Sequence, residues 1–562
     1  MTSFFVYRHL RAILFAALTA ILVLTIPQAR SQANAGAGRI LLVLPFDNLT
    51  SPATTATSGQ PTDPTSIDWI REAAPEILNA RFASAGFLPL GREDRLYAFD
   101  HLGLPEGLQP SRATALRLAQ TLDANYILIG SYNVVGPTLT LKSRILDVDK
   151  LHLSDELSVS GELSQLIPLL NSLAWRLTRK LDPAFNVAEE TFRAAGARLR
   201  LDAFEQYVRG LTERDPAERL RHLKKATDLS PEFTEAWLAM GKLQFANQQY
   251  EEAAVSFEKV TRGPSVDDPS ELEAAFYRGL SLMFSGNYSR AEDAFGAVAR
   301  MLPLPEVVNN QGVAMSRRGH DAVPLFRQAA AGDPTDADYQ FNLALSLHRH
   351  GDNAGAVTAI EQSLKLRPND SEAKALQDAW KSPSDKAPTT DALERIKRTY
   401  NGAAFRQAGI MLDQVEAARL AALPGPERAA RLSKTAREKL DRGLLLEAER
   451  EYQAAIAADD RSADAHAGLA QVRERVGDTD GARKEAKAAL DRQPNADANL
   501  VLARLDLAAN QLEKARDEAA DAIKIDPSNR AAKDLHHAIE TRIESQSGAN
   551  TKPATPPGTS NP

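Results

Sequence analysis

Cysteine is absent from the 562 residues of this chain. Its absence excludes disulfide bonds, thiol nucleophiles, thiolate metal sites and a lipid-modified N-terminal cysteine. An excess of basic residues is also missing, because 67 Lys and Arg face 74 Asp and Glu and the formal net charge is −7. A general nucleic-acid-binding protein shows the opposite balance, so we expect no nucleic-acid partner.

The short motifs of common catalytic and nucleotide-binding sites are missing as well. The sequence has no H-E-x-x-H, G-x-x-x-x-G-K-[ST], G-x-S-x-G or G-x-G-x-x-G pattern. Two histidine pairs stand close in sequence, His348 with His350 and His536 with His537. On a helix these spacings turn the two rings to different sides, so neither pair can share a metal ion. We therefore predict no enzymatic activity, no cofactor and no metal site.

Residues 1–33 have the layout of an export signal. Arg8 and Arg11 precede the apolar run 12–26, and Ser31-Gln32-Ala33 places small residues at the −3 and −1 positions of a cleavage site. This order is typical of a secretory signal peptide, and the apolar run is short for a membrane span. The alternative is an uncleaved anchor. In both cases we expect the bulk of the chain in the periplasm or another extracytoplasmic part of the envelope. If the signal is cleaved, we expect no stable membrane span in the remaining chain.

Residues 39–181 alternate between strand-type and helix-type patterns, which predicts an α/β domain. Runs rich in Leu, Ile and Val, bounded by turn residues, predict strands at 39–46, 87–90, 126–135, 138–148 and 151–160. Helical periodicity predicts helices at 67–85, 111–122 and 163–181. A polar loop is expected at 50–66. The prediction is a mixed sheet of about five strands with three helices.

Three short motifs in this domain point to a family. They are Val43-Leu44-Pro45-Phe46-Asp47-Asn48, Asn125-Tyr126-Ile127-Leu128-Ile129-Gly130-Ser131 and Leu146-Asp147-Val148-Asp149. In this order they resemble the TolB-type N-terminal domain and the related nucleus of the CsgG family of envelope proteins. The resemblance covers residues 39–181 and implies an envelope protein-interaction domain. Secretion channels of the CsgG type also carry a lipidated cysteine and membrane-spanning hairpins, which this sequence lacks, so we expect no pore.

A pattern with a period close to 34 residues fills the rest of the chain. Its clearest copy is Trp237, Met240-Gly241, Ala253, Phe257 and Pro264. Twelve positions separate the two small residues of each copy in Gly241/Ala253, Gly279/Ala291, Ala344/Ala356, Ala436/Ala448, Ala470/Ala482 and Ala503/Ala515. Small residues at this spacing allow two antiparallel helices to pack closely, and the large residue four positions later fills the seam between them. One copy, Gly312/Ala322, is separated by ten positions, which predicts a shortened turn.

This pattern resembles the tetratricopeptide repeat (TPR). The resemblance implies an all-α superhelical solenoid that follows the α/β domain and binds other proteins or peptides. The sequence divides the solenoid into a proximal array at 202–368, a linker and helical connector at 369–428, and a distal array with a capping helix at 429–546. Within the connector, Ser382–Pro388 reads as a surface linker and helical sequence resumes at 392–422. The Pro/Thr/Ser/Gly-rich tail 547–562 is expected to be disordered.

The inner face of the proximal array is the candidate binding site. Counted from the register of each repeat, its positions are Leu238, Lys242, Phe245, Phe276, Leu280, Met283, Asn309, Val313, Phe341 and Leu345. An apolar, aromatic groove suits an extended or helical peptide, although each of these residues could instead pack between repeats. The corresponding distal positions are charged, which predicts a second surface of different character. We interpret the chain as an exported scaffold or adaptor; the alternative is a structural subunit of a secretion or pilus assembly machine. The oligomeric state stays open.

Overall fold

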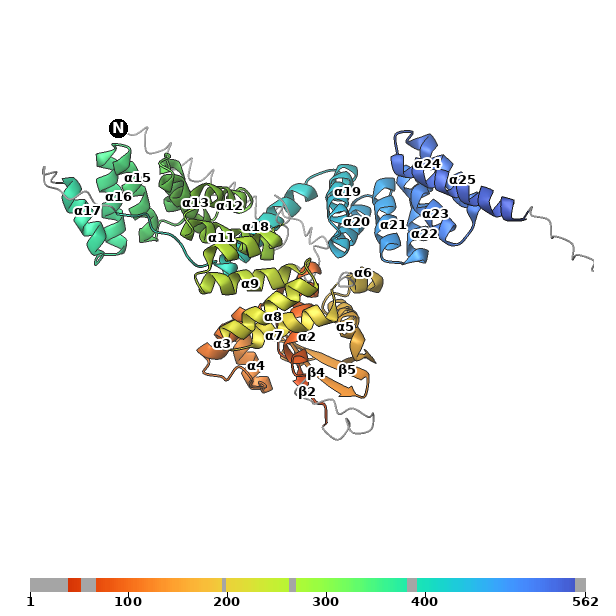
Figure 1. The fold of residues 1–562 in the computed structure, drawn as a ribbon, viewed down its shortest axis with the longest axis horizontal. Helices are drawn as coiled ribbons and strands as arrows, with labels where there is room; N and C mark the ends of the chain where they lie inside the picture. Colours follow the sequence, from red (N-terminus) through yellow and green to blue (C-terminus); the bar gives the residue numbers. More distant parts are fainter. Residues whose placement is uncertain (1–38, 52–66, 195–198, 262–268, 382–391, 551–562) are drawn as a thin grey trace, which may run out of the picture.

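The computed structural model describes residues 39–51, 67–194, 199–261, 269–381 and 392–550. The predicted signal peptide, most of the predicted loop 50–66, the linker at 382–388 and the end of the predicted tail lie outside these residues. Figure 1 shows an α/β domain below two helical arrays, one on each side. No helix in the described ranges combines the length and apolar character that a membrane crossing needs.

The α/β domain contains a mixed sheet, as predicted. Its strands are β1 (Ile40–Val43), β2 (Asp47–Asn48), β3 (Leu88–Pro89), β4 (Tyr126–Val135), β5 (Thr138–Asp147), β6 (His152–Leu153) and β7 (Leu157–Glu162). The order is β3-β1-β4-β5-β6, with β2 paired to β4 and β7 paired to β5. Pairs β1–β3, β1–β4 and β2–β4 are parallel, and the others are antiparallel.

The sheet has seven strands rather than about five, because β2 follows the first predicted run and the run 151–160 is divided into β6 and β7. The first run breaks at Pro45, which has no N–H to donate to a ladder. The run 151–160 breaks after Leu153, where the Ser154 hydroxyl accepts the N–H of Ile145 at 3.0 Å in place of a strand carbonyl. Both interruptions are local effects of one side chain.

Helices cover both faces of the sheet. They are α2 (Ile70–Ser84), α3 (Arg92–His101), α4 (Arg112–Thr121) and α5 (Leu166–Leu181). Successive residues of a strand point to opposite faces. Leu41 and Val43 accordingly share a core cluster with α2 and α5, whereas Leu42 and Leu44 share another with α3 and α4.

Helix α3 is a fourth helix where the sequence predicted three. Only Arg95, Ala98 and Phe99 of its ten residues are buried, so its apolar periodicity is weak. The predicted cap of α4 is confirmed, because the Ser111 hydroxyl accepts the N–H of Thr114 at 3.2 Å.

The remainder of the described chain is helical. A connector helix α6 (Glu189–Ala194) leads to α7 (Leu201–Thr212), α8 (Pro216–Leu229), α9 (Thr234–Ala246), α10 (Tyr250–Val260), α11 (Pro269–Phe284), α12 (Tyr288–Met301), α13 (Pro305–Arg317), α14 (Val323–Gly332), α15 (Ala337–Arg349), α16 (Asn353–Leu366) and α17 (Ser371–Lys381). After a gap follow α18 (Gly402–Ala421), α19 (Gly425–Asp441), α20 (Leu445–Ala458), α21 (Ala463–Arg475), α22 (Thr479–Leu490), α23 (Ala496–Ala508), α24 (Leu512–Ile525) and α25 (Arg530–Asn550). The last helix runs past the predicted end of the capping helix at 546.

The small residues predicted at the helix crossings lie against large side chains. A Cβ added to Gly241 would stand 2.7 Å from the ring of Phe257, and one added to Gly279 would stand 2.7 Å from Phe295. Both rings are fully buried. Glycine is required here because the facing ring already fills the space that a side chain would need. These contacts produce the stacked helix pairs of a TPR-like solenoid.

One predicted helical stretch is wrong. Residues 392–401 contain no helix, and α18 begins only at Gly402. Figure 1 shows this stretch as a teal coil that passes the proximal helices and leads into α18. Its backbone is bonded to side chains of the proximal array instead of to itself, as described below.

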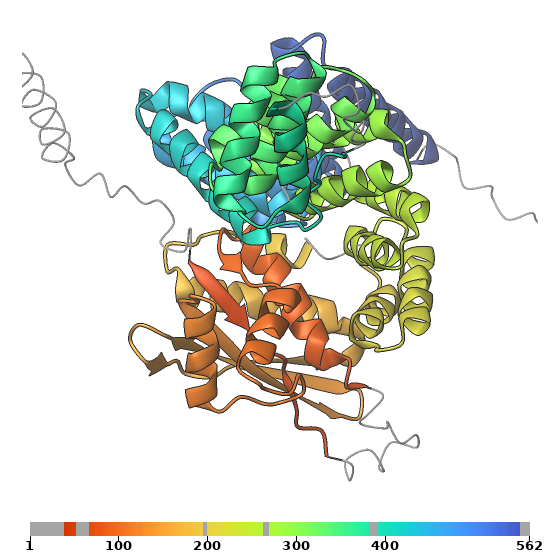
Figure 2. The same ribbon diagram turned by 90° about the vertical axis from the view of Figure 1, so that its left-hand side faces the viewer.

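The first repeats and α20 connect the arrays to the α/β domain. In Figure 2 the yellow and yellow-green helices rise beside that domain toward the arrays. On the distal side, Glu449 of α20 accepts the N–H of Ala188 at 3.0 Å and the hydroxyl of Thr191. Arg450 donates to the carbonyl of Ser84, at the end of α2, at 2.7 Å. The distal array is thus joined to the α/β domain through buried polar contacts.

Candidate peptide-binding groove

Two asparagines of the proximal array hold an extended segment of the chain, residues 392–400, by its backbone. Asn342 of α15 donates to the carbonyl of Arg395 at 2.8 Å and accepts its N–H at 2.7 Å. Asn310 of α13 donates to the carbonyl of Lys397 at 2.8 Å and accepts its N–H at 2.9 Å. Each amide therefore binds both main-chain groups of one residue, on alternate residues of an extended strand. We call 392–400 the internal segment.

A third asparagine connects these two. Asn309 donates to the carbonyl of Arg395 at 3.0 Å and to Asn310 at 3.3 Å, and it accepts from Asn342 at 2.8 Å. All three asparagines are fully buried. A buried amide is costly unless its hydrogen bonds are made, so this network is stable only with a backbone lying against it.

We call four acidic residues of the groove the acidic wall, namely Asp336, Asp338, Asp370 and Glu372, and the Arg395 side chain lies against the last three of them. It donates to both oxygens of Asp370 at 2.6 and 3.0 Å and to Glu372 at 3.0 Å. It also lies 3.2 Å from Asp338 and 3.6 Å from the ring centre of Phe341. Bidentate pairing combined with stacking on a ring is a mode that arginine provides and lysine does not.

Lys397 occupies the other end of the acidic wall. Its ammonium lies 2.5 Å from Asp336 and 2.8 Å from Asp338. Burial opposes ionisation of Asp338, but hydrogen bonds from Arg367 and Lys397 outweigh burial and hold the pKa of Asp338 at about 2. Asp338 therefore stays ionised at neutral pH beside the basic side chains of Arg367 and Lys397.

The segment also places one acid in a basic environment. Glu394 is buried and forms an ion pair with Arg317 at 2.9 Å and another with Arg349. Arg349 also donates to the carbonyl of Ala392 at 2.9 Å. We call Arg317 and Arg349 the arginine pair. The charges of the groove thus change from positive at Glu394 to negative at Arg395 and Lys397, and at each position they are opposite to the charge of the segment.

Aromatic contacts hold the C-terminal end of the segment. The Tyr400 ring lies 5.7 Å from Phe276 and 4.3 Å from Phe405, the first buried ring of α18. Ile396 packs against the same apolar cluster. Arg398 lies over the ring of Phe284, with 5.2 Å to its centre. The groove therefore contacts the segment from Ala392 to Tyr400.

The predicted groove residues lie in three different environments. Asn309, Phe276 and Phe341 contact the internal segment directly. Leu280, Met283, Val313 and Leu345 are buried in the clusters on which the segment packs. Leu238, Lys242 and Phe245 lie farther along the array. Leu238 and Phe245 pack against Phe257, and Lys242 forms ion pairs with Glu273 at 2.7 Å and with Glu93 of α3.

Several polar residues that bind the segment were missed by the sequence analysis, namely the acidic wall, the arginine pair and the two asparagines Asn310 and Asn342. A signal for the two asparagines exists, because Asn310 and Asn342 each stand two positions before the small residue of the first helix of their repeat, Gly312 and Ala344. Buried amides at one register position of successive repeats mark a face that binds a main chain.

The charged positions of the distal array pair with one another. Arg504 binds Glu474 through two bonds of 2.5 and 2.6 Å, and Arg437 forms an ion pair with Asp497. No group of three or more His, Asp or Glu able to hold a metal ion occurs in the part of the chain that the structure describes.

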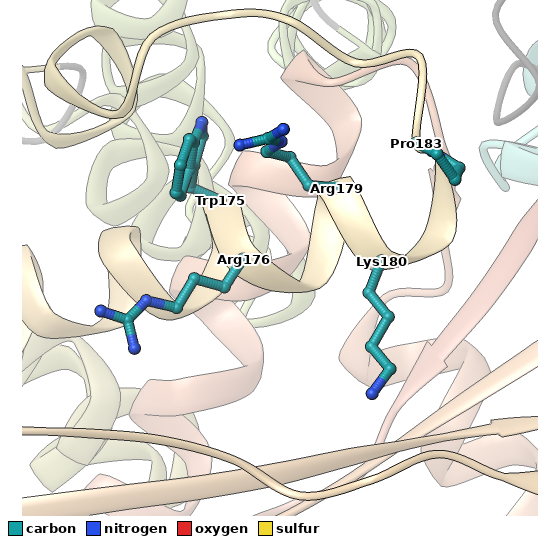
Figure 3. Close-up of a pocket in the computed structure, with 5 residues that line it drawn as sticks. All are labelled: Trp175, Arg176, Arg179, Lys180 and Pro183. Carbon is teal, nitrogen blue, oxygen red and sulfur yellow. The ribbon is translucent and has the colours of Figure 1, made fainter.

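A surface hollow of about 350 Å³ lies elsewhere, on α5, next to Trp175 and Pro183. Figure 3 shows Trp175 and Arg179 on one side of this helix and Lys180 pointing toward the sheet. Arg176 donates to the carbonyl of Ser158 in β7 at 3.1 Å, and Lys180 donates to the carbonyl of Asp155, between β6 and β7, at 3.3 Å. These basic groups therefore help to fix α5 on the sheet.

Comparison with known proteins identifies the repeats. The sequence profile described as "Tetratricopeptide repeat" matches residues 238–304, 316–371 and 469–530. These segments are tetratricopeptide repeats, and proteins built from such repeats are protein-interaction scaffolds. A search of curated protein sequences found no match.

Several solved structures are similar to parts of the chain. A crystal structure of MamA is 19% identical over 29% of this chain and 94% of its own, with a TM-score of 0.27. YrrB, described as a TPR protein with an unusual peptide-binding site, is 15% identical over 37% of this chain and 99% of its own, with a TM-score of 0.28. A tetratricopeptide repeat protein from Parabacteroides merdae is 12% identical over 55% of this chain and 98% of its own, with a TM-score of 0.24.

Proposed function

We propose that this protein is an exported, non-enzymatic scaffold of the bacterial cell envelope that holds partner proteins in the groove of its proximal array. The observation that carries the proposal is the binding of alternate backbone residues by Asn310 and Asn342. Such bonds recognise the N–H and carbonyl groups of an extended main chain, which any protein can supply. An enzyme would need a constellation of reactive side chains, and neither the motifs of the sequence nor the described groove supplies one.

The envelope location is supported by the first 33 residues, whose charged, apolar and small-residue parts follow the order of a secretory signal. Alkaline phosphatase fused after residue 60 tests it, because this enzyme is active only where its disulfides form, outside the cytoplasm. We expect activity from the full fusion and none when residues 1–33 are deleted. Equal activity of both fusions would contradict export by this segment.

The groove is tested by proximity labelling in the source cell. The double variant Asn310→Ala, Asn342→Ala should lose the proteins that the wild type labels, because it cannot bind a main chain. The matched control is Asn369→Ala, an exposed asparagine directly after the proximal array. An unchanged set of labelled proteins in the double variant would rule out this groove as the binding site.

Asparagines are the right choice for this test because the aromatic residues are structural. Phe276 and Phe341 are fully buried, and removing a buried phenylalanine costs about 3–5 kcal/mol of folding stability. A variant without these rings would lose partners by unfolding as well as by loss of contact. The amides offer a change of small volume on the face that binds.

A further inference from the structure

We infer that the proximal groove selects extended peptides of the pattern Glu-Arg-apolar-Lys, and that the internal segment is the chain's own copy of this ligand, which a partner must displace. The inference rests on the proposed function, since it requires that the groove binds other proteins. It adds the chemistry of the partner and the competitor that the partner meets.

The internal segment is held as a ligand is held. Its backbone bonds go to side chains that stand 53 to 87 positions away in sequence. Main-chain binding of an extended peptide gives affinity, and pockets for its side chains give specificity. The segment uses both, because the asparagines bind its backbone at 395 and 397 and the groove contacts its side chains at 394, 395 and 397.

Four consecutive positions of the segment are read by the groove, and Leu393 before them is not. Glu394 is buried between the arginine pair, and Arg395 and Lys397 fill the acidic wall. Ile396 between them packs on the apolar cluster. In contrast, the side chain of Leu393 is 56% exposed. A partner peptide must therefore supply an acid, an arginine, an apolar residue and a lysine in this order.

The negative charges of the acidic wall exclude peptides that carry an acidic residue at the position of Arg395. An acidic residue in place of Arg395 would meet Asp370 and Asp338 at the distances that now join opposite charges. Like charges so placed, partly removed from water, repel one another, which gives discrimination as well as affinity. An acidic peptide is for this reason a poor ligand of the groove.

Covalent attachment makes the internal segment a strong competitor. A tethered ligand acts at an effective concentration on the order of 1 mM, so a free peptide with the same contacts must exceed this concentration to displace it. Partners that succeed must make further contacts, for example with another part of the scaffold. The wild-type groove is therefore selective for proteins over short peptides.

The test uses the full-length chain and a fluorescent peptide with the sequence of residues 392–400, Ala-Leu-Glu-Arg-Ile-Lys-Arg-Thr-Tyr. In the double variant Arg395→Ala, Lys397→Ala the internal segment is weakened while the groove keeps its asparagines and its acidic wall. The peptide should bind this opened variant at least about 30-fold more tightly than the wild type. Adding Asn310→Ala and Asn342→Ala should abolish the binding, and Leu393→Ala alone should behave like the wild type.

A second opened variant guards against misfolding. Here residues 392–400 are replaced by nine Gly and Ser residues, which leaves every groove residue intact, and circular dichroism verifies the helix content of both variants. A control peptide with Glu in place of its first Arg and of its Lys should not bind either variant.

The outcomes are distinguishable. Equal binding of both peptides to the opened groove would overturn the pattern and leave the proposed function standing. Equal binding of the first peptide to wild type and opened variants would overturn the competition by the internal segment. Absence of binding to both folded, opened variants would overturn the inference and the proposed peptide groove together.

Discussion

Replacing Asn342 by alanine should release the internal segment while the rest of the chain stays folded. The Asn342 amide makes bonds of 2.8 and 2.7 Å to the backbone of Arg395 and one of 2.8 Å to Asn309. It stands two positions from Ala344, the small residue of the crossing with α16, and this spacing turns it to nearly the opposite side of α15, so the helix pair keeps its apolar contacts. The lost interactions belong to the docking of residues 392–400.

The size of the effect follows from these three bonds. Each hydrogen bond contributes about 1 kcal/mol net, and a buried group left without a partner costs about 1–3 kcal/mol. The Arg395 carbonyl retains its bond from Asn309, whereas its N–H loses its partner. We therefore expect about 2–3 kcal/mol, which is about a 30- to 150-fold increase in the population of the released segment.

Hydrogen exchange measures this population. In the variant, amides of residues 392–400 should exchange about 30- to 150-fold faster, while amides of α15 and α16 stay protected. Trypsin provides a second readout, because Arg395, Lys397 and Arg398 become accessible cleavage sites in the released segment. Asn369→Ala is the matched control and should leave both rates unchanged. Less than a threefold change at 392–400, or equal acceleration throughout the array, would refute the reasoning.

Three further predictions concern other parts of the chain. Burial and the neighbouring charge of Asp506 raise the pKa of Glu518 to about 7, above its unfolded value, so its ionisation lowers stability as pH rises from about 5 to 8. Glu518→Gln should therefore increase the free energy of unfolding at pH 8 by about 1 kcal/mol, after allowance for solvent screening, and leave it unchanged at pH 5. The measurement is the melting temperature at the two pH values. Glu449→Ala removes the buried carboxylate that joins α20 to the connector, and should detach the distal array at a cost of about 3 kcal/mol, seen as increased dimensions in X-ray scattering. Gly279→Ala should destabilise the proximal array by about 1–3 kcal/mol in urea titrations, since the new Cβ meets a buried ring, whereas Gly409→Ala, with open space around it, should not.

The architecture was predictable because local rules determine it. The spacing of Gly279 and Ala291 follows from the close approach of two helices, and one facing ring is enough to make glycine necessary. The same local reasoning failed at residues 392–401, whose Ala, Leu, Glu, Arg and Lys favour a helix. Here bonds from Asn310 and Asn342 stabilise an extended backbone, and a contact over 53 or more positions cannot be read from local propensity.

The location of the candidate site could be predicted from the repeat register, but the type of contact that it makes could not. The register of the repeats placed Asn309, Phe276 and Phe341 on the inner face, where they contact the internal segment. Apolar character does not distinguish binding residues from packing residues here, because Leu280 and Val313 are fully buried and serve packing. The buried amides carry the recognition, because they are the groups that need a main chain to satisfy them.

The two arrays differ at one register position, and this difference decides which of them can hold a main chain. The position lies two residues before the small residue of the first helix in each repeat. It is occupied by Ala239, Tyr277, Asn310 and Asn342 in the proximal array and by Lys434, Gly468 and Val501 in the distal array. Tyr277 hydrogen bonds the backbone of Tyr400, so the three polar residues at this proximal position contact the backbone of the internal segment in turn.

The distal residues at that position cannot repeat this arrangement. Lysine donates without accepting, and glycine and valine have no polar side-chain atom, so none can bind both groups of a peptide unit. The distal arginines are also already paired, as Arg504 is with Glu474. A partner of the distal array would have to break such pairs or bind another face. In the proposed function, peptide binding through the backbone therefore belongs to the proximal array, and the second surface expected from the sequence would have to bind by side-chain contacts alone.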